Sequence, residues 1–232
     1  MAKSREEGGS DVCAKANRIL EKLNKEAGEH ELIDDIDPHI NTLRNGIHIV
    51  IGERGSGKTY YTMKEALKIA LLPKKQQTYR NLYYVSNMND DATFNRICPE
   101  ISKRGIQCEW ILDDDALPFI EQLIEAKNEM APDEKSDSFI IFDDAMYLFK
   151  DNRALEKKMY KTRQPRITIY IIIHDVSGIS ASLRSSANEV IVFGGMSPFK
   201  YGWLARTFPC VKEVPYEQYA ELEPNDYIIF YK

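Results

Sequence analysis

Residues 47–59 read IHIVIGERGSGKT, and this stretch decides the fold. Its first part, residues 47–51, is apolar and β-branched, which predicts a short buried strand. The remainder, residues 52–59, matches in full the pattern GxxxxGK followed by Ser or Thr. Residues 60–72 then repeat apolar side chains at helical spacing as far as Pro73. A glycine-rich loop between a strand and a helix is the setting in which this pattern binds phosphate, so we predict a P-loop.

The chemistry of phosphate binding gives each part of this loop a role. Glycines let backbone N–H groups curl around the phosphates, and the helix N-terminus adds partial positive charge. We expect Lys58 to reach the β- and γ-phosphates and Thr59 to bind Mg²⁺ through its hydroxyl. The residues expected to contact ATP are Gly52, Glu53, Arg54, Gly55, Ser56, Gly57, Lys58, Thr59 and Tyr60.

A second acid is needed to hold the metal, and residues 139–142 (FIIF) run directly into Asp143 and Asp144. Asp143 has the placement of a Walker B carboxylate, so we expect it to be the second protein ligand of Mg²⁺. Asp144 is the candidate general base. Glu is more usual there, and the missing methylene shortens the reach by about 1.5 Å. The alternative for the pair is a solvated turn after a strand.

The remaining apolar runs predict the architecture. Strands are expected at residues 82–85, 107–112, 139–142, 167–173, 190–193 and 227–231, and a helix at 117–130. Because these strands are apolar throughout and alternate with helices, we predict a three-layer α/β sandwich around a mainly parallel sheet. We divide the chain into an N-terminal helical extension (1–45), a P-loop core (46–193) and a β-rich C-terminal extension of the same domain (194–232).

Bulk properties narrow the class of protein. With 232 residues the chain suffices for one globular domain, and a formal net charge of −5 argues against coating nucleic acid by bulk electrostatics. Between residues 153 and 166, however, basic side chains cluster around a single acid, Glu156. The chain has no apolar run of about 18 residues and a polar N-terminus, so we expect a soluble protein made in the cytosol, without a membrane span.

The order of these motifs resembles the additional-strand ATPases. More narrowly, residues 46–193 resemble the FtsK/HerA superfamily, and within it the genome-packaging ATPases of large eukaryotic DNA viruses, virophages and membrane-containing icosahedral viruses. That group carries an arginine ahead of the fourth core strand, a polar sensor at its end, and then Leu-Arg or Ile-Arg followed by Ala or Asn. Arg163, His174 and residues 183–188 (LRSSAN) match these features. The group's sensor is usually glutamine, so His174 is a departure.

This resemblance implies a function and further site residues. It implies ATP hydrolysis in a homo-oligomeric ring, a hexamer or a pentamer, that draws double-stranded DNA into a preformed capsid. It also implies contact with capsid vertex proteins and a place in the host cytoplasm or on the virion. Arg163 is implied as an arginine finger for a neighbouring subunit's nucleotide, with Arg166 and Arg184 as rivals. Lys157, Lys158 and Lys161 are candidates for a loop that meets DNA phosphates.

Other classes of function stay open at this stage. Residues 163–166 (RQPR) resemble the paired arginines of a kinase lid, which fits a nucleotide or nucleoside kinase. A nucleotide-gated assembly factor would bind ATP without releasing phosphate, and a cellular DNA pump would share the motor. In the C-terminal part, Trp203, Phe208, Tyr216 and Tyr219 are expected to pack in the core or between subunits instead of stacking on DNA.

Overall fold

The computed structural model describes residues 45–72, 78–88, 90–131, 134–144, 148–149, 153–160 and 165–231, together with Lys15, Arg18, Ile19 and Lys22. These four N-terminal residues are helical, and Ile19 packs against the core. The rest of the predicted N-terminal extension lies outside the described residues.

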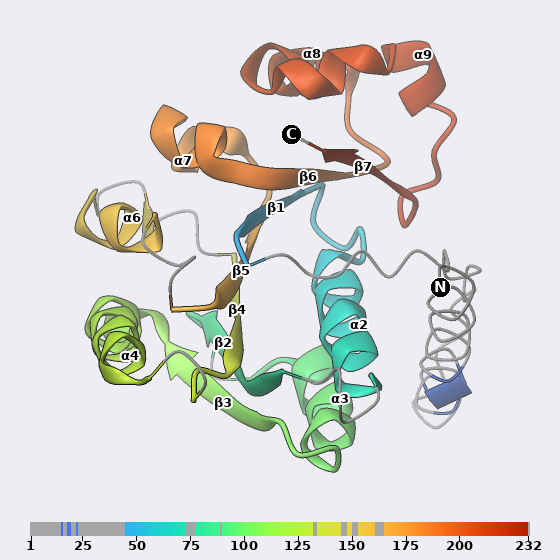
Figure 1. The fold of residues 1–232 in the computed structure, drawn as a ribbon. Helices are drawn as coiled ribbons and strands as arrows, with labels where there is room; N and C mark the ends of the chain where they lie inside the picture. The colour runs from blue at the N-terminus through green and yellow to red at the C-terminus, as the bar shows by residue number, and fades with distance from the viewer. Residues whose placement is uncertain are drawn as a thin grey trace, which may run out of the picture.

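The centre of the molecule is one seven-stranded sheet with the order β3-β2-β4-β5-β1-β6-β7 (Figure 1). The strands are β1 (Ile47–Ile51), β2 (Tyr79–Ser86), β3 (Gln107–Leu112), β4 (Asp137–Asp143), β5 (Ile167–Ile173), β6 (Ala187–Phe193) and β7 (Tyr227–Tyr231). Neighbouring strands are parallel, except that β7 pairs antiparallel with β6. The predicted strands and the mainly parallel sheet are therefore confirmed.

Strand β5 lies between β1, which leads into the P-loop, and β4, which ends at Asp143. All of its residues are buried, as its uninterrupted run of isoleucine, threonine and tyrosine predicts. Since all three strands are parallel, their carboxyl ends emerge at the same edge of the sheet. This edge brings Gly52, His174 and Asp144 together, although they are far apart in sequence.

Helices cover both faces of the sheet and complete three layers (Figure 1). Helices α2 (Lys58–Ala70) and α3 (Ala92–Ser102) pack on one face, and α4 (Ala116–Glu129) and α6 (Arg153–Met159) pack on the other. The shorter elements are η1 (Asp113–Asp115), η2 (Val176–Gly178) and α7 (Ala181–Ser186). In the part of the chain that the structure describes, no helix combines the length and the apolar character needed to cross a membrane.

The C-terminal part differs from its prediction. Instead of a β-rich extension, residues 194–231 form α8 (Pro198–Thr207), η3 (Pro209–Glu213) and α9 (Tyr216–Tyr219), followed by the single strand β7. Prolines and aromatic residues suggested broken strands, but here the prolines begin helices: Pro198 opens α8 directly after Ser197, whose side chain caps the Lys200 N–H. Phe208 and Tyr219 are fully buried, so the expected packing role is confirmed for them.

Candidate active site

The P-loop, residues 52–57, joins β1 to α2 in a turn that requires glycine. Gly55 and Gly57 have φ angles of 81° and 84°, in the left-handed region that strains any side chain. At Gly52 the limit is space, because a Cβ atom would lie 2.6 Å from Ser56 Oγ. Helix α2 begins at Lys58 without a side-chain cap. The first backbone N–H groups of a helix have no intrahelical acceptor, so this turn offers them to an anion.

Lys58 lies folded over the loop. Its Nζ donates hydrogen bonds to the carbonyl oxygens of Gly52 at 3.1 Å and Glu53 at 2.7 Å. Burial lowers the pKa of Lys58 from 10.5 to about 8, although the charges of Asp143, Asp144 and Glu53 act in the opposite direction. Its three close partners, these two carbonyl oxygens and the ring of His174, carry no full negative charge, so the ammonium still lacks the counter-charge that a polyphosphate would supply.

Thr59 and Asp143 are in direct contact. Thr59 Oγ1 donates a hydrogen bond of 2.7 Å to Asp143 Oδ2, and the buried hydroxyl of Tyr84 donates to the same oxygen. Burial raises the pKa of Asp143, and these two hydrogen bonds oppose the rise. The nearby charge of Asp91, which caps helix α3, adds to it. The sheet therefore unites the two predicted metal ligands from separate motifs.

His174 lies between Asp144 and Lys58 and connects the end of β4 to the P-loop. Asp144 has a φ angle of 51°, a left-handed conformation that aspartate tolerates better than most residues, and it is exposed. Its Oδ1 lies 3.5 Å from His174 Nε2, while His174 Nδ1 lies 3.2 Å from Lys58 Nζ and 3.1 Å from Gly52 O. The roles of the two ring nitrogens depend on the tautomer: with a proton on Nε2 the ring donates towards Asp144 and accepts from Lys58, and with a proton on Nδ1 it donates to Gly52 O.

The residues present fit a nucleoside triphosphate with Mg²⁺. The hydroxyl of Thr59 and the carboxylate of Asp143 are oxygen ligands of the kind that Mg²⁺ prefers. Mg²⁺ commonly takes one or two protein ligands and completes its shell with phosphate and water. The uncapped start of α2 and the left-handed glycines provide the phosphate cradle beside these oxygens.

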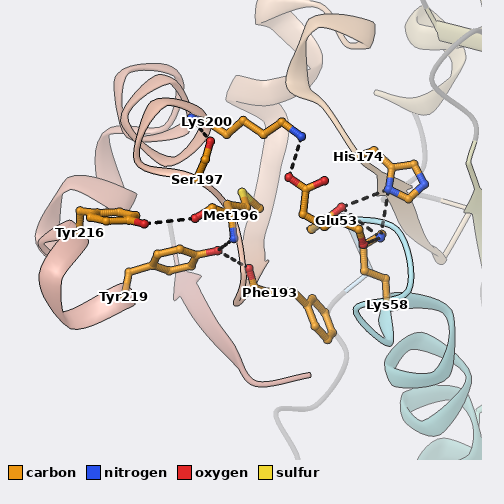
Figure 2. A network of polar contacts seen from close by, with 10 residues as sticks. Glu53, Lys58, His174, Phe193, Met196, Ser197, Lys200, Tyr216 and Tyr219 are labelled. Atoms are coloured by element: carbon orange, nitrogen blue, oxygen red, sulfur yellow. Dashed lines mark hydrogen bonds and ion pairs between the residues drawn. The ribbon is translucent and has the colours of Figure 1, made fainter. Parts of the chain in front are cut away.

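Two contacts at this site were not predicted from the sequence. One is the hydroxyl of Tyr84 on Asp143. The other is an ion pair between Lys200 Nζ and Glu53 Oε1 at 2.6 Å, by which α8 touches the P-loop. Figure 2 shows Lys200 reaching from α8 towards Glu53, beside Lys58 and His174. Both contacts depend on how distant segments pack; the only local signal was the Ser-Pro start of α8, which places Lys200 in the first helical turn.

The basic stretch expected to form a DNA-binding loop is partly helical. Leu155 and Met159 are fully buried at a helical spacing of four residues, and this apolar pair fixes α6 against the core. The prediction of a loop is therefore wrong for Lys157 and Lys158. Helix α6 covers the face of the sheet opposite α2 (Figure 1).

The two lysines differ in their surroundings. Lys157 is exposed, whereas Lys158 Nζ lies 3.1 Å from Glu121 Oε1 on α4. Lys161 and Arg163 lie outside the described residues, so their predicted roles stay predictions.

The rival arginines are both engaged elsewhere. Arg166 precedes β5 at the edge of the sheet opposite the P-loop, where its Nε lies 2.6 Å from Asp137 Oδ1. Arg184 donates to the carbonyl oxygens of Val176 at 3.3 Å and Ile179 at 2.7 Å.

The fold and the site define a class: this chain has the fold of a P-loop NTPase of the additional-strand type. It is similar to the genome packaging NTPase B204 from Sulfolobus turreted icosahedral virus 2 in complex with AMP, with 18% identity and a TM-score of 0.55 over 81% of this chain and 92% of that chain. It is also similar to B204, the DNA-packaging ATPase from Sulfolobus turreted icosahedral virus, with 18% identity and a TM-score of 0.54 over 81% of this chain and 98% of that chain.

A likeness to a cellular protein extends over a similar part of the chain. The cytoplasmic domain of the Thermomonospora curvata type VII secretion ATPase EccC aligns with 14% identity and a TM-score of 0.50, over 80% of this chain and 25% of that chain. No known protein family and no curated protein matches the sequence. The structural likenesses confirm the fold class that the motifs predicted.

Proposed function

We propose that this chain is a Mg²⁺-dependent ATPase that drives double-stranded DNA into a viral capsid. The observation that carries the ATPase proposal is the 2.7 Å hydrogen bond from Thr59 Oγ1 to Asp143 Oδ2. It joins the last residue of the P-loop motif to the aspartate that ends β4, the arrangement that a metal bound between triphosphate and protein requires.

The residues divide the chemistry between them. Lys58 neutralises charge on the phosphates, and Thr59 and Asp143 hold Mg²⁺, which when bound stabilises the charge that develops on the phosphate oxygens. Asp144 orients and deprotonates the water whose oxygen attacks the γ-phosphorus as the bond to the ADP oxygen breaks. Its exposure leaves it free to meet that water. His174 joins Asp144 to Lys58, so it is placed to sense whether the γ-phosphate is present.

The DNA-packaging part of the proposal rests on fold and resemblance. The two B204 structures are described as a genome packaging NTPase and a DNA-packaging ATPase. Further structures of the genome packaging NTPase contain ATP-gammaS or AMPPCP. By analogy, subunits of this chain would form a ring on DNA at a capsid vertex in the host cytoplasm. Lys157, Lys158 and Lys161 would meet the DNA backbone, and Arg163 would act on the neighbouring subunit's ATP.

The test is ATP turnover with and without duplex DNA, with the oligomer size recorded in the same sample. We expect Mg²⁺-dependent phosphate release that duplex DNA stimulates, in an assembly larger than a dimer, with DNA binding that weakens as salt rises. Absence of any DNA effect would remove the packaging role while leaving an ATPase. ADP release only with a phosphate acceptor would indicate a kinase, and assembly without phosphate release would indicate a nucleotide-gated assembly factor.

The arginine finger has its own test. Replacing Arg163 with Ala should reduce hydrolysis by about 10³-fold or more, because the transition state loses a positive charge supplied by a neighbour. Nucleotide binding should remain. Full turnover by the variant would transfer the role to another residue.

A further inference from the structure

We propose that Tyr84 is a positioning residue for the metal site: its hydroxyl fixes one oxygen of Asp143 so that the other faces Mg²⁺. This inference rests on the proposed ATPase function, which assigns Asp143 to the metal. Tyr84 belongs to β2, the strand next to β4 on the side away from β5, and it carries no part of any motif in the sequence.

The first support is the pattern of hydrogen bonds on Asp143. Both hydrogen bonds that it accepts from the described residues, from Thr59 and from Tyr84, end on Oδ2. One carboxylate oxygen has two lone pairs, so two hydroxyl donors occupy it fully. The geometry therefore leaves Oδ1 as the oxygen for a cation. Thr59 keeps its own lone pairs for the same ion while it donates its proton.

The second support is that the position of the Tyr84 hydroxyl is fixed by packing. The side chain is only 1% exposed. Its ring lies 4.9 Å from the ring of Phe94 and 4.8 Å from that of Trp110, measured between centroids. The rings of Phe94 and Trp110 also contact each other, with centroids 5.0 Å apart, so the three rings form one packed cluster. A side chain fixed in such a cluster cannot swing away, so it restricts the carboxylate that it contacts.

The same strand provides a matched control in Tyr79. It is also buried, on the same face of the sheet, and its Oη lies 2.6 Å from Thr168 Oγ1 near the opposite edge. Tyr79→Phe therefore removes a buried hydroxyl and a side-chain hydrogen bond, as Tyr84→Phe does, but at a distance from the P-loop.

The experiment measures metal binding without turnover. Mn²⁺ replaces Mg²⁺, and free Mn²⁺ is followed by electron paramagnetic resonance at a saturating concentration of a non-hydrolysable ATP analogue. We expect Tyr84→Phe to weaken Mn²⁺ binding by about 10-fold or more, the usual cost of losing a group that orients a metal ligand. Tyr79→Phe should bind Mn²⁺ as the wild type does. With excess chelator, all three proteins should bind the nucleotide alone equally, since the P-loop is intact.

Each other outcome decides against a specific claim. Equal Mn²⁺ binding by Tyr84→Phe and wild type would overturn the role of Tyr84 and leave the proposed ATPase standing. Equal weakening in both variants, or loss of metal-free nucleotide binding in Tyr84→Phe, would assign the hydroxyl to general packing and overturn it too. A wild-type protein that takes up no Mn²⁺ with the nucleotide would contradict the proposed function itself.

Discussion

Strand β4 begins and ends with an aspartate, and the two are held in different ways. Asp137, at the start, receives two contacts from Arg166, with Nε at 2.6 Å from Oδ1 and Nη2 at 3.1 Å from Oδ2. The hydroxyl of Thr78 also donates to it. Asp143, at the end, is held by neutral hydroxyl groups, and none of the described lysines or arginines forms an ion pair with it.

The difference separates a structural carboxylate from one prepared for chemistry. The charge of Asp137 is already neutralised by a bidentate guanidinium, so this edge of the sheet has no further need of a cation. The charge of Asp143 is oriented but not neutralised at contact distance, because Lys58 donates to the carbonyl groups of Gly52 and Glu53. Binding of a divalent ion would stabilise a carboxylate in this state by neutralising its charge.

The largest effect is expected from Asp143→Asn. The amide keeps the shape of the side chain but loses its negative charge, so kcat should fall by about 10³-fold, equivalent to several kcal/mol of lost metal-dependent stabilisation. The free energy of unfolding without nucleotide should not fall, because the change removes a buried charge. Phosphate release and urea unfolding, measured on one preparation, check both parts. Substantial hydrolysis by the variant would end the distinction between the two acids.

The opposite result is expected from Asp137→Asn. Arg166 would lose its ionic partner, and we expect the free energy of unfolding to fall by about 2 kcal/mol, less than for a fully buried pair because the Arg166 side chain is 34% exposed. ATP turnover per folded molecule should stay close to that of the wild type. If turnover fell as far as in Asp143→Asn, the two ends of β4 would not have separate roles.

A smaller effect is expected from Tyr79→Phe at the same edge as Asp137. Burial, with a contribution from Asp137, raises the pKa of Tyr79 to about 12. The folded state therefore keeps a proton that the unfolded state loses above its ordinary pKa of about 10, so the stability that Tyr79 contributes falls as pH rises between these values. At pH 8 the free energy of unfolding of the wild type should exceed that of Tyr79→Phe by about 1 kcal/mol.

This difference in the free energy of unfolding should disappear by about pH 11, because each pH unit between the two pKa values lowers the stability of the wild type by up to about 1.4 kcal/mol. Urea unfolding of both proteins at pH 8, 10 and 11 measures it. An advantage that stays constant with pH would mean that the phenol is not held neutral by the fold.

The smallest effect is expected from Lys200→Met at the P-loop edge. The Lys200 and Glu53 side chains are 49% and 39% exposed, so the pair should contribute no more than about 0.5 kcal/mol. We expect the substitution to change nucleotide affinity by at most about twofold. This change should vanish at high salt, because salt screens the exposed pair. Lys212→Met, an exposed lysine on η3, is the control. A change of more than about tenfold, corresponding to 1.4 kcal/mol, would show that α8 has a direct part in binding.

The sequence predicts best what local chemistry determines. The strand before the P-loop, the loop itself and the two acids at the end of β4 follow from short stretches in which each residue type has one physical use. The long apolar runs of β4 and β5 likewise allow little besides a buried strand. Helix α3 was not predicted; in the structure Asp91 caps the helix and Pro99 lies inside it.

The sequence predicts least where distant segments meet. Tyr84 reaches Asp143 only because β2 neighbours β4, and strand order is not encoded in any local pattern. Lys200 meets Glu53 for a similar reason, and it was also hidden by the wrong prediction of strands after residue 194. Aromatic residues favour strands by propensity, but packing of Tyr201 and Tyr219 on the core prevails over it.

The position of β5 has a consequence for how this site can change. Because β5 lies in the middle, His174 contacts Lys58 through one ring nitrogen and Asp144 through the other. Substitutions at residues 58 and 144 are thereby coupled through a shared neighbour, and their effects will not add. A substitution at any one of residues 58, 144 and 174 would change the effect of substitutions at the other two, so we expect these three residues to change together in evolution.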